Sequence, residues 1–117
     1  MKPISLPVHG AIDYLAVVIF AAAPAVIGLS GWPAALSYAL AGIHLLMTLL
    51  TDFPAGAIKV IPVALHQWVE RIVGPLLIIL ALVAMSGTPA RAFFVAMGVI
   101  IFAAERLTAY HPTAAAK

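Results

Sequence analysis

The stretch His66-Gln67-Trp68-Val69-Glu70-Arg71 stands at the start of a long apolar run and places an imidazole and a carboxylate four residues apart. Residues i and i+4 lie on one face of a helix, so both side chains point the same way. The same arrangement, His9-Gly10-Ala11-Ile12-Asp13-Tyr14, opens the first apolar run of the chain. Two equivalent pairs predict a duplicated helical unit with a polar cluster between its halves.

The composition is typical of a membrane protein. Of the 117 residues, 65% are hydrophobic and 9% are charged, whereas soluble domains are roughly half apolar and a quarter charged. No charged residue occurs between Tyr14 and Thr51. A small soluble domain exposes too much surface to leave so much of it uncharged. We therefore expect a single membrane domain, residues 1–117, with the lipid bilayer as its main partner.

Several function classes have little support in the sequence. The basic residues are scattered rather than gathered into a patch, so we expect no nucleic-acid partner. Cysteine is absent, which excludes disulfides and thiolate ligands. No nucleophile elbow, zinc-protease motif or phosphate-binding loop occurs. We therefore expect a protein that is not an enzyme.

Four apolar segments, at about 10–29, 33–51, 66–86 and 90–109, are each long enough to cross a hydrocarbon core of about 30 Å. Turn signals separate the members of each pair, at Ser30-Gly31-Trp32-Pro33 and at Ser86-Gly87-Thr88-Pro89. Pro3 and Pro7 oppose helix formation, so the first helix is predicted to begin near His9. Pro24 lacks a backbone donor, which leaves the Phe20 carbonyl without its usual helical partner.

The two halves align as a repeat. His9 and His66 are 57 residues apart (66 − 9), as are Asp13 and Glu70 (70 − 13), and the turn signals are 56 apart (86 − 30). We assign repeat 1 to about 9–54, a connector to about 55–65, and repeat 2 to about 66–112. Each repeat crosses twice, so both enter from the same side. The prediction is an all-α bundle of four transmembrane helices, built from two tandem two-helix hairpins with a pseudo-two-fold axis along the membrane normal.

Orientation follows from the basic residues near the helix ends. One side of the predicted bundle holds five of them and the other side holds only Arg91. The positive-inside rule then places both termini in the cytoplasm. The five cytoplasmic basic residues are Lys2, Lys59, Arg71, Arg106 and Lys117.

The sequence also resembles a known family. The residues that carry the likeness are Pro7-Val8-His9-Gly10-Ala11-Ile12-Asp13-Tyr14, Ala23-Pro24, Thr51-Asp52-Phe53-Pro54-Ala55-Gly56, Ile61-Pro62 and His66. In these the chain resembles the SPW-repeat membrane proteins, small bacterial proteins of two tandem two-helix units. Of the Ser-Pro-Trp signature for which that family is named, Ala23-Pro24-Ala25 keeps only the proline. The resemblance implies a multi-pass protein of the bacterial inner membrane and no particular activity.

Nine polar residues are expected to gather in the cytoplasmic half of the bundle: His9, Asp13, His44, Thr48, His66, Glu70, Arg71, Glu105 and Arg106. His9 and His66 are predicted at the rim, with Asp13 and Glu70 close together. Ionisable groups in lipid need partners, so we expect Arg71 and Arg106 to neutralise acids on neighbouring helices. Arg106 is predicted to contact Glu70 or Asp13.

Three functions remain open for this polar cluster. In the first, it holds together a structural or accessory protein without a cofactor, which self-associates or joins a larger membrane complex. In the second, His9, Asp13, His66 and Glu70 bind a divalent metal, since imidazole and carboxylate suit zinc, iron and manganese, or the two histidines bind haem. In the third, the cluster conducts protons or a small solute.

Overall fold

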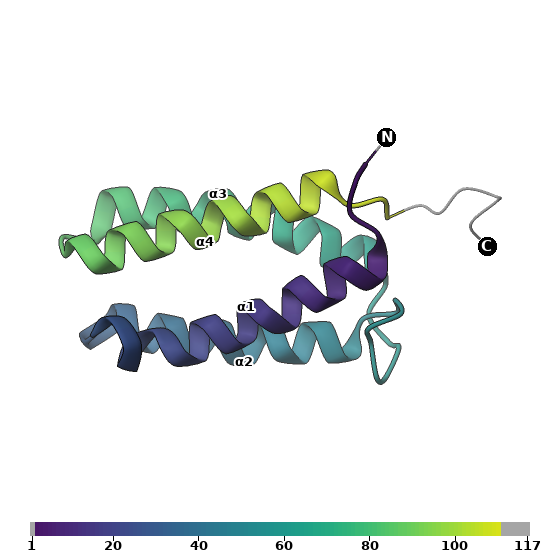
Figure 1. Ribbon diagram of the computed structural model, residues 1–117, viewed down its shortest axis with the longest axis horizontal. Helices are drawn as coiled ribbons and strands as arrows, with labels where there is room; N and C mark the ends of the chain where they lie inside the picture. Colours follow the sequence, from purple (N-terminus) through teal and green to yellow (C-terminus); the bar gives the residue numbers. More distant parts are fainter. Residues whose placement is uncertain (1, 111–117) are drawn as a thin grey trace.

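The computed structural model describes residues 2–110, which form four α-helices and no named strand. Helix α1 spans Leu6–Ile27, α2 spans Gly31–Leu50, α3 spans Val63–Ala84 and α4 spans Thr88–Leu107. Figure 1 shows two hairpins, α1 with α2 and α3 with α4, and the most extensive helix packing is within each hairpin. The start of the chain, the α2–α3 connector and the end of α4 lie at one end of the bundle. The predicted all-α fold is thereby confirmed.

All four helices begin earlier than predicted, α1 and α3 by the most. Helix α1 starts at Leu6 rather than near His9, because Pro7 falls in the first turn, where a backbone N–H has no acceptor within the helix. Ser5 caps this helix by accepting a hydrogen bond from the Val8 amide at 3.4 Å. Helix α3 starts at Val63, three residues before His66. Both histidines therefore lie in the first turn of their helices.

Each helix boundary of the first hairpin recurs 57 residues later in the second hairpin. The first residues of α1 and α3 are 57 positions apart (63 − 6), and so are those of α2 and α4 (88 − 31). Helices α1 and α3 each have 22 residues, and α2 and α4 each have 20. The helix boundaries thus keep the 57-residue spacing of the His–acid pairs. They keep it at the turns as well, although the turn motifs in the sequence are 56 residues apart. The last helix consequently covers 88–107 rather than the predicted 90–109.

The segments that precede α1 and α3 make equivalent backbone pairings. Ile4 donates to the Leu107 carbonyl at 3.1 Å and accepts from the Ala109 amide at 2.9 Å. In the same way Ile61 donates to the Leu50 carbonyl at 2.7 Å and accepts from the Asp52 amide at 2.7 Å. Each pairing fixes the residue that follows a helix: Thr108 after α4 and Thr51 after α2.

The proline inside α1 is compensated by a side chain of α2. The helix continues through Pro24, and the Phe20 carbonyl that this proline cannot bond accepts a hydrogen bond from the Ser37 hydroxyl at 2.6 Å. Both residues are fully buried. The sequence predicted the unpaired carbonyl, and the structure identifies its donor.

The hydrophobic side chains point both inward and outward. A buried apolar core, which includes Phe20, Leu77 and Phe94, fills the half of the bundle away from the connector. On the outside, large aliphatic side chains are exposed along every helix, up to 77% for Val26 and 80% for Val83. Helices α1, α2 and α3 are long and apolar enough to cross a membrane. Helix α4, which carries Arg91, Glu105 and Arg106, is not among them.

Helices α3 and α4 touch through two glycines. A Cβ atom on Gly98 would lie 2.6 Å from the Gly74 carbonyl oxygen and 2.7 Å from the side chain of Ile78. By contrast, a Cβ on Gly42 of α2 would meet nothing within 4 Å. The glycine of α4 is therefore required by packing, and that of α2 is not.

We predict that Gly98→Ala lowers the free energy of unfolding by about 1–3 kcal/mol, since the added methyl group overpacks a closed contact. Gly42→Ala is the matched control, and it should leave stability unchanged or raise it by up to about 1 kcal/mol, because alanine favours helix over glycine. Denaturation of both variants in detergent micelles measures the difference. Equal effects at the two positions would contradict the close α3–α4 contact.

Candidate metal centre

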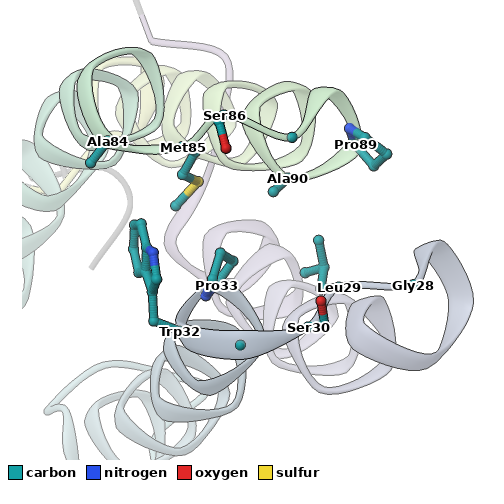
Figure 2. Close-up of a pocket in the computed structure, with 12 residues that line it drawn as sticks. Gly28, Leu29, Ser30, Trp32, Pro33, Ala84, Met85, Ser86, Pro89 and Ala90 are labelled. Carbon is teal, nitrogen blue, oxygen red and sulfur yellow. The ribbon is translucent and has the colours of Figure 1, made fainter.

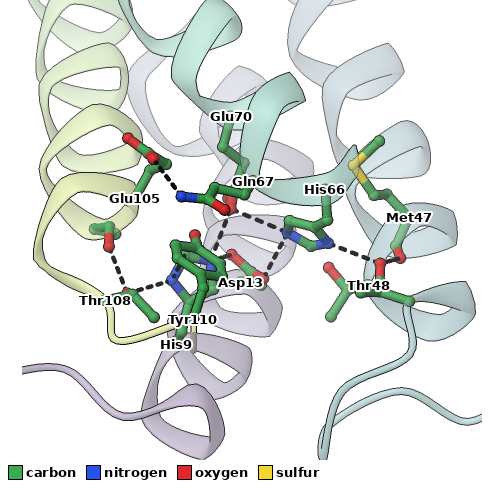
Figure 3. A network of polar contacts seen from close by, with 12 residues as sticks. His9, Asp13, Met47, Thr48, His66, Gln67, Glu70, Glu105, Thr108 and Tyr110 are labelled. Atoms are coloured by element: carbon green, nitrogen blue, oxygen red, sulfur yellow. Dashed lines mark hydrogen bonds and ion pairs between the residues drawn. The ribbon is translucent and has the colours of Figure 1, made fainter. Parts of the chain in front are cut away.

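The two histidines of the repeated pairs meet in the interior of the bundle. His9 of α1 and His66 of α3 are both fully buried, with ring centroids 5.8 Å apart. Each histidine contacts an acid from its own helix and an acid from the other hairpin, so Asp13 and Glu70 lie between the two rings, as Figure 3 shows. The structure therefore brings together the four residues that the sequence singled out, and it buries all of them.

The distances among these four residues are short. His9 Nε2 lies 2.7 Å from Glu70 Oε1 and 3.3 Å from Asp13 Oδ1. His66 Nε2 lies 3.0 Å from Glu70 Oε1 and 3.1 Å from Asp13 Oδ2. One ligand atom from each residue can be chosen so that all four lie within 4.8 Å of one another. In a tetrahedral zinc site with bonds of about 2.0–2.1 Å, neighbouring ligand atoms are separated by about 3.4 Å.

Two of these ligand atoms lack a hydrogen-bond partner. Asp13 Oδ2 and His66 Nε2 are both buried and unpaired, although they are only 3.1 Å apart. Their separation suits an ion pair, but their directions do not suit a hydrogen bond. Buried polar atoms without partners are uncommon and costly, and here two of them lie next to each other within the group of four side chains.

Two threonine hydroxyls contact the Nδ1 atoms of the two histidines and orient their rings. The Thr108 hydroxyl lies 2.7 Å from His9 Nδ1, and the Thr51 hydroxyl lies 2.8 Å from His66 Nδ1. Each hydroxyl donates its single hydrogen to a backbone carbonyl at 2.5 Å, that of Ala104 or Met47. Each can therefore only accept from the histidine, which places a hydrogen on Nδ1. With a hydrogen on Nδ1, each ring turns its Nε2 atom toward the carboxylates, and a deprotonated Nε2 is the atom by which such a histidine binds a metal.

An aromatic ring covers each histidine. Tyr110 packs on His9 and Phe53 packs on His66, both with ring centroids 5.4 Å apart. Burial, together with the nearby carboxylates of Glu70 and Asp13, raises the pKa of the Tyr110 phenol well above its ordinary value. The phenol therefore keeps its proton, and the rings shield the polar centre without adding charge.

His44 of α2 reaches the same two acids from another side. Its Nε2 lies 3.3 Å from Asp13 Oδ1 and 3.6 Å from Glu70 Oε2. The predicted cluster member Thr48 is buried one turn away, and its hydroxyl donates to the His44 carbonyl at 2.7 Å rather than to an acid.

Arg71 neutralises an acid on a neighbouring helix, as predicted, whereas the predicted contact of Arg106 with Glu70 or Asp13 is wrong. Arg71 donates two hydrogen bonds, at 2.8 and 3.1 Å, to the buried Glu105 of α4, which also accepts from Gln67 at 3.3 Å. The Arg106 side chain is 48% exposed, and among residues 2–110 its one acidic partner is its neighbour Glu105, at 3.8 Å. Successive helix residues point about 100° apart, so the buried Glu105 turns Arg106 outward. The carboxylates of Asp13 and Glu70 face histidines instead.

Two cavities lie outside the centre. A cavity of about 360 Å³ lies between the two hairpin turns, where Figure 2 shows Trp32 and Leu29 of one turn facing Met85 and Ala90 of the other. It is at the end of the bundle remote from the histidines. A second cavity, of about 250 Å³, is lined by Lys2, Gln67, Ala109 and Tyr110, next to the ring that covers His9.

Sequence reasoning missed the residues that surround the four central side chains. Thr51 and Thr108 are 57 positions apart (108 − 51), and so are Phe53 and Tyr110 (110 − 53). The spacing that relates the histidines would have found both pairs. The assigned end of repeat 2, with His111 and Pro112, lies outside the described residues.

No protein-family model, curated protein or solved structure matches this chain. The resemblance to SPW-repeat proteins therefore stays a prediction, and the candidate site is argued from its own geometry.

We predict that Thr108→Val destabilises the bundle by about 1–3 kcal/mol, because the buried His9 Nδ1–H loses its acceptor while the shape of the side chain is kept. Thr108→Ser retains the hydroxyl and should stay close to the wild type. Thr88→Val, at the exposed start of α4, is the control for the substitution itself. Equal unfolding free energies for Thr108→Val and Thr88→Val would show that the hydroxyl does not hold the histidine.

Proposed function

We propose that this chain is a small integral membrane protein that binds one divalent transition-metal ion through His9, Asp13, His66 and Glu70. The observation that carries the proposal is the set of four buried ligand atoms within 4.8 Å of one another, two of them without a hydrogen-bond partner. Two imidazoles and two carboxylates suit zinc, iron or manganese. The two negative charges balance one divalent cation, which lowers the cost of placing charge in an apolar interior.

The ion would have a structural effect, because its ligands come from both hairpins. His9 and Asp13 belong to α1, and His66 and Glu70 belong to α3, while the closest helix packing is within each hairpin. A bound ion would therefore hold the two hairpins together at this end. We further propose that the protein has an accessory, non-enzymatic role, in which it self-associates or joins a larger membrane complex.

The other two functions are supported less well. Haem would need the space between the two imidazoles, and the carboxylates of Asp13 and Glu70 stand there. A proton or solute path would have to continue through the other half of the bundle, where the buried side chains, such as Phe20 and Phe94, are apolar. A metal ion needs neither a wide cleft nor a continuous polar path.

The proposal includes four membrane crossings. Helix α4 is as long as α2 and packs along α3. Its buried acid, Glu105, is paired with Arg71, which lowers the cost of inserting it in lipid. Each boundary of α1 and α2 recurs 57 residues later in α3 and α4. This spacing supports a tandem duplication, in which both hairpins enter the membrane from the same side. We place the protein in the bacterial inner membrane with both termini in the cytoplasm.

The metal proposal is tested on purified protein loaded with Zn²⁺. We expect one zinc ion per chain by elemental analysis, and none in a His66→Ala, Glu70→Gln double variant. A ligand that binds only the folded state stabilises it by about 2.7 kcal/mol at a concentration a hundredfold above Kd, so a strong chelator should lower the melting temperature of the wild type.

Arg106→Gln is the control for zinc binding, since its side chain points away from the centre, and it should bind zinc as the wild type does. If the wild type holds no zinc and its melting temperature is the same with and without the chelator, the four side chains form an internal network of hydrogen bonds and ion pairs only.

The orientation is tested by single cysteines in the cysteine-free chain. We predict that a cysteine replacing Lys59 is protected from an impermeant thiol reagent in intact cells, whereas one replacing Arg91 is labelled, because the positive-inside rule puts the lysine side in the cytoplasm. Both should react after the cells are opened. The reverse pattern in intact cells would invert the topology.

A further inference from the structure

We propose that the outer face of the second hairpin binds one phospholipid of net negative charge through an arginine patch, formed by Trp68, Arg71 and Arg106. The lipid phosphate accepts hydrogen bonds from the two guanidinium groups, and the tryptophan ring lies beside the upper acyl chains. This surface is separate from the metal centre and needs no bound metal. The proposal rests only on the part of the proposed function that places α3 and α4 in a membrane.

The three residues of the arginine patch are joined through the buried acid of α4. Arg71 donates to Glu105 Oε1 from Nε at 3.1 Å and from Nη2 at 2.8 Å, and its Cζ atom lies 4.5 Å from the centroid of the Trp68 ring. Arg106 Nη1 lies 3.8 Å from the other oxygen, Glu105 Oε2. The Arg71 and Arg106 side chains are 27% and 48% exposed, and Trp68 is 55% exposed. The two guanidinium groups and the indole ring therefore reach the outer surface at neighbouring points.

The arginine patch carries one positive charge that the protein does not neutralise. Arg71 is paired with Glu105, whereas Arg106 is too far from this carboxylate for a hydrogen bond. Glu105 Oε2 is accordingly left without a hydrogen-bond partner. All four acidic residues of the chain lie within residues 2–110, and among them Glu105 alone forms an ion pair with Arg106. Two arginines and one carboxylate leave a net charge of +1 (2 − 1).

A phospholipid supplies the missing counter-charge at this level of the bundle. Arg106 is the last residue but one of α4, and Trp68 lies in the second turn of α3, so the patch is near the helix ends. Tryptophan is enriched at the membrane–water interface, and a long arginine side chain extends from there toward the headgroups. A cation that faces lipid needs a partner, and guanidinium groups bind phosphate through paired N–H donors.

The excess charge selects the headgroup. Phosphatidylglycerol carries a single negative charge and therefore neutralises the arginine patch. Phosphatidylcholine carries the same phosphate but adds an ammonium group, which would lie beside two guanidinium groups and be repelled. In the first hairpin, the residues 57 positions before Arg71 and Arg106 are Tyr14 and Leu49, neither of which is charged. We therefore expect one anionic phospholipid on the second hairpin and none at the equivalent place on the first.

The two tryptophans of the chain allow a local measurement. Trp32 lies in the first turn of α2, at the opposite end of the bundle, and at 48% its exposed fraction is close to that of Trp68. Each is observed alone, in Trp32→Phe or Trp68→Phe, in vesicles of phosphatidylcholine and phosphatidylglycerol. One lipid or the other is brominated on its upper acyl chain, so that it quenches a nearby tryptophan.

We expect Trp68 to be quenched more strongly by the brominated anionic lipid and Trp32 to be quenched nearly equally by both lipids. The preference at Trp68 should correspond to an enrichment of roughly fivefold or more, the effect of one basic residue at a membrane surface.

Arg106→Gln should abolish the preference of Trp68 for the anionic lipid, because it removes the excess charge while Arg71 stays paired with Glu105. Lys59→Gln is the matched control. It removes an equal charge from the α2–α3 connector, at the same end of the bundle, and should retain the preference. Circular dichroism checks that both variants are helical, and Arg106→Met replaces Arg106→Gln should the glutamine variant fail to fold.

Three results would overturn the lipid site. Equal quenching of Trp68 by the two brominated lipids in the otherwise unchanged protein would show that no anionic lipid is enriched there. An equal loss of preference in Arg106→Gln and Lys59→Gln would show a response to the general charge of this end of the bundle. Loss of the preference when inorganic phosphate is added would show a site for a soluble phosphate. Zinc binding is measured separately and is unaffected by each of these results, so failure of the lipid site and failure of the metal site are distinguishable.

Discussion

Two carboxylates, Asp13 and Glu70, lie side by side in the interior of an apolar bundle, and the rest of the centre is arranged around them. Like charges repel strongly where water is excluded, so such a pair requires positive charge or hydrogen-bond donors on several sides. Histidines supply them here, His9 and His66 from the first turns of two helices and His44 from a third. An imidazole can be a donor, a cation or a metal ligand, and that versatility distinguishes this arrangement from a simple ion pair.

The sequence could predict the helices and the four central residues because both follow from local periodicity. Histidine and acid four residues apart share a helix face, and the 57-residue spacing relates the two faces. The threonines lie outside the helical periodicity that identified the histidines, because Thr51 and Thr108 stand just after their helices. The 57-residue spacing relates the two threonines to each other, but their place beside the histidines depends on backbone pairing with Ile61 and Ile4. That pairing belongs to the folded chain and follows from no helical pattern in the sequence.

The arginines show a different limit of sequence reasoning. The cost of charge in lipid predicted that Arg71 and Arg106 neutralise acids on neighbouring helices, but it gave no direction for each side chain. Rotation by about 100° per residue separates Arg71 from Glu70 and Arg106 from Glu105. Arg71 therefore pairs with Glu105, and Arg106 faces outward. The assignment of partners required the helix rotations, which follow from the packing of whole helices, for example through Gly74 and Gly98.

The backbone pairing of Ile4 has a topological consequence. It ties the residues before α1 to those after α4, as Ile61 ties the α2–α3 connector to the end of α2. The two ends of the described chain, residues 2–110, therefore meet where the connector also lies. Proteins whose ends lie together commonly tolerate circular permutation. A chain opened in the connector and joined where its ends now meet would read α3, α4, α1, α2 and keep the four central residues on the same helices and the same helix faces.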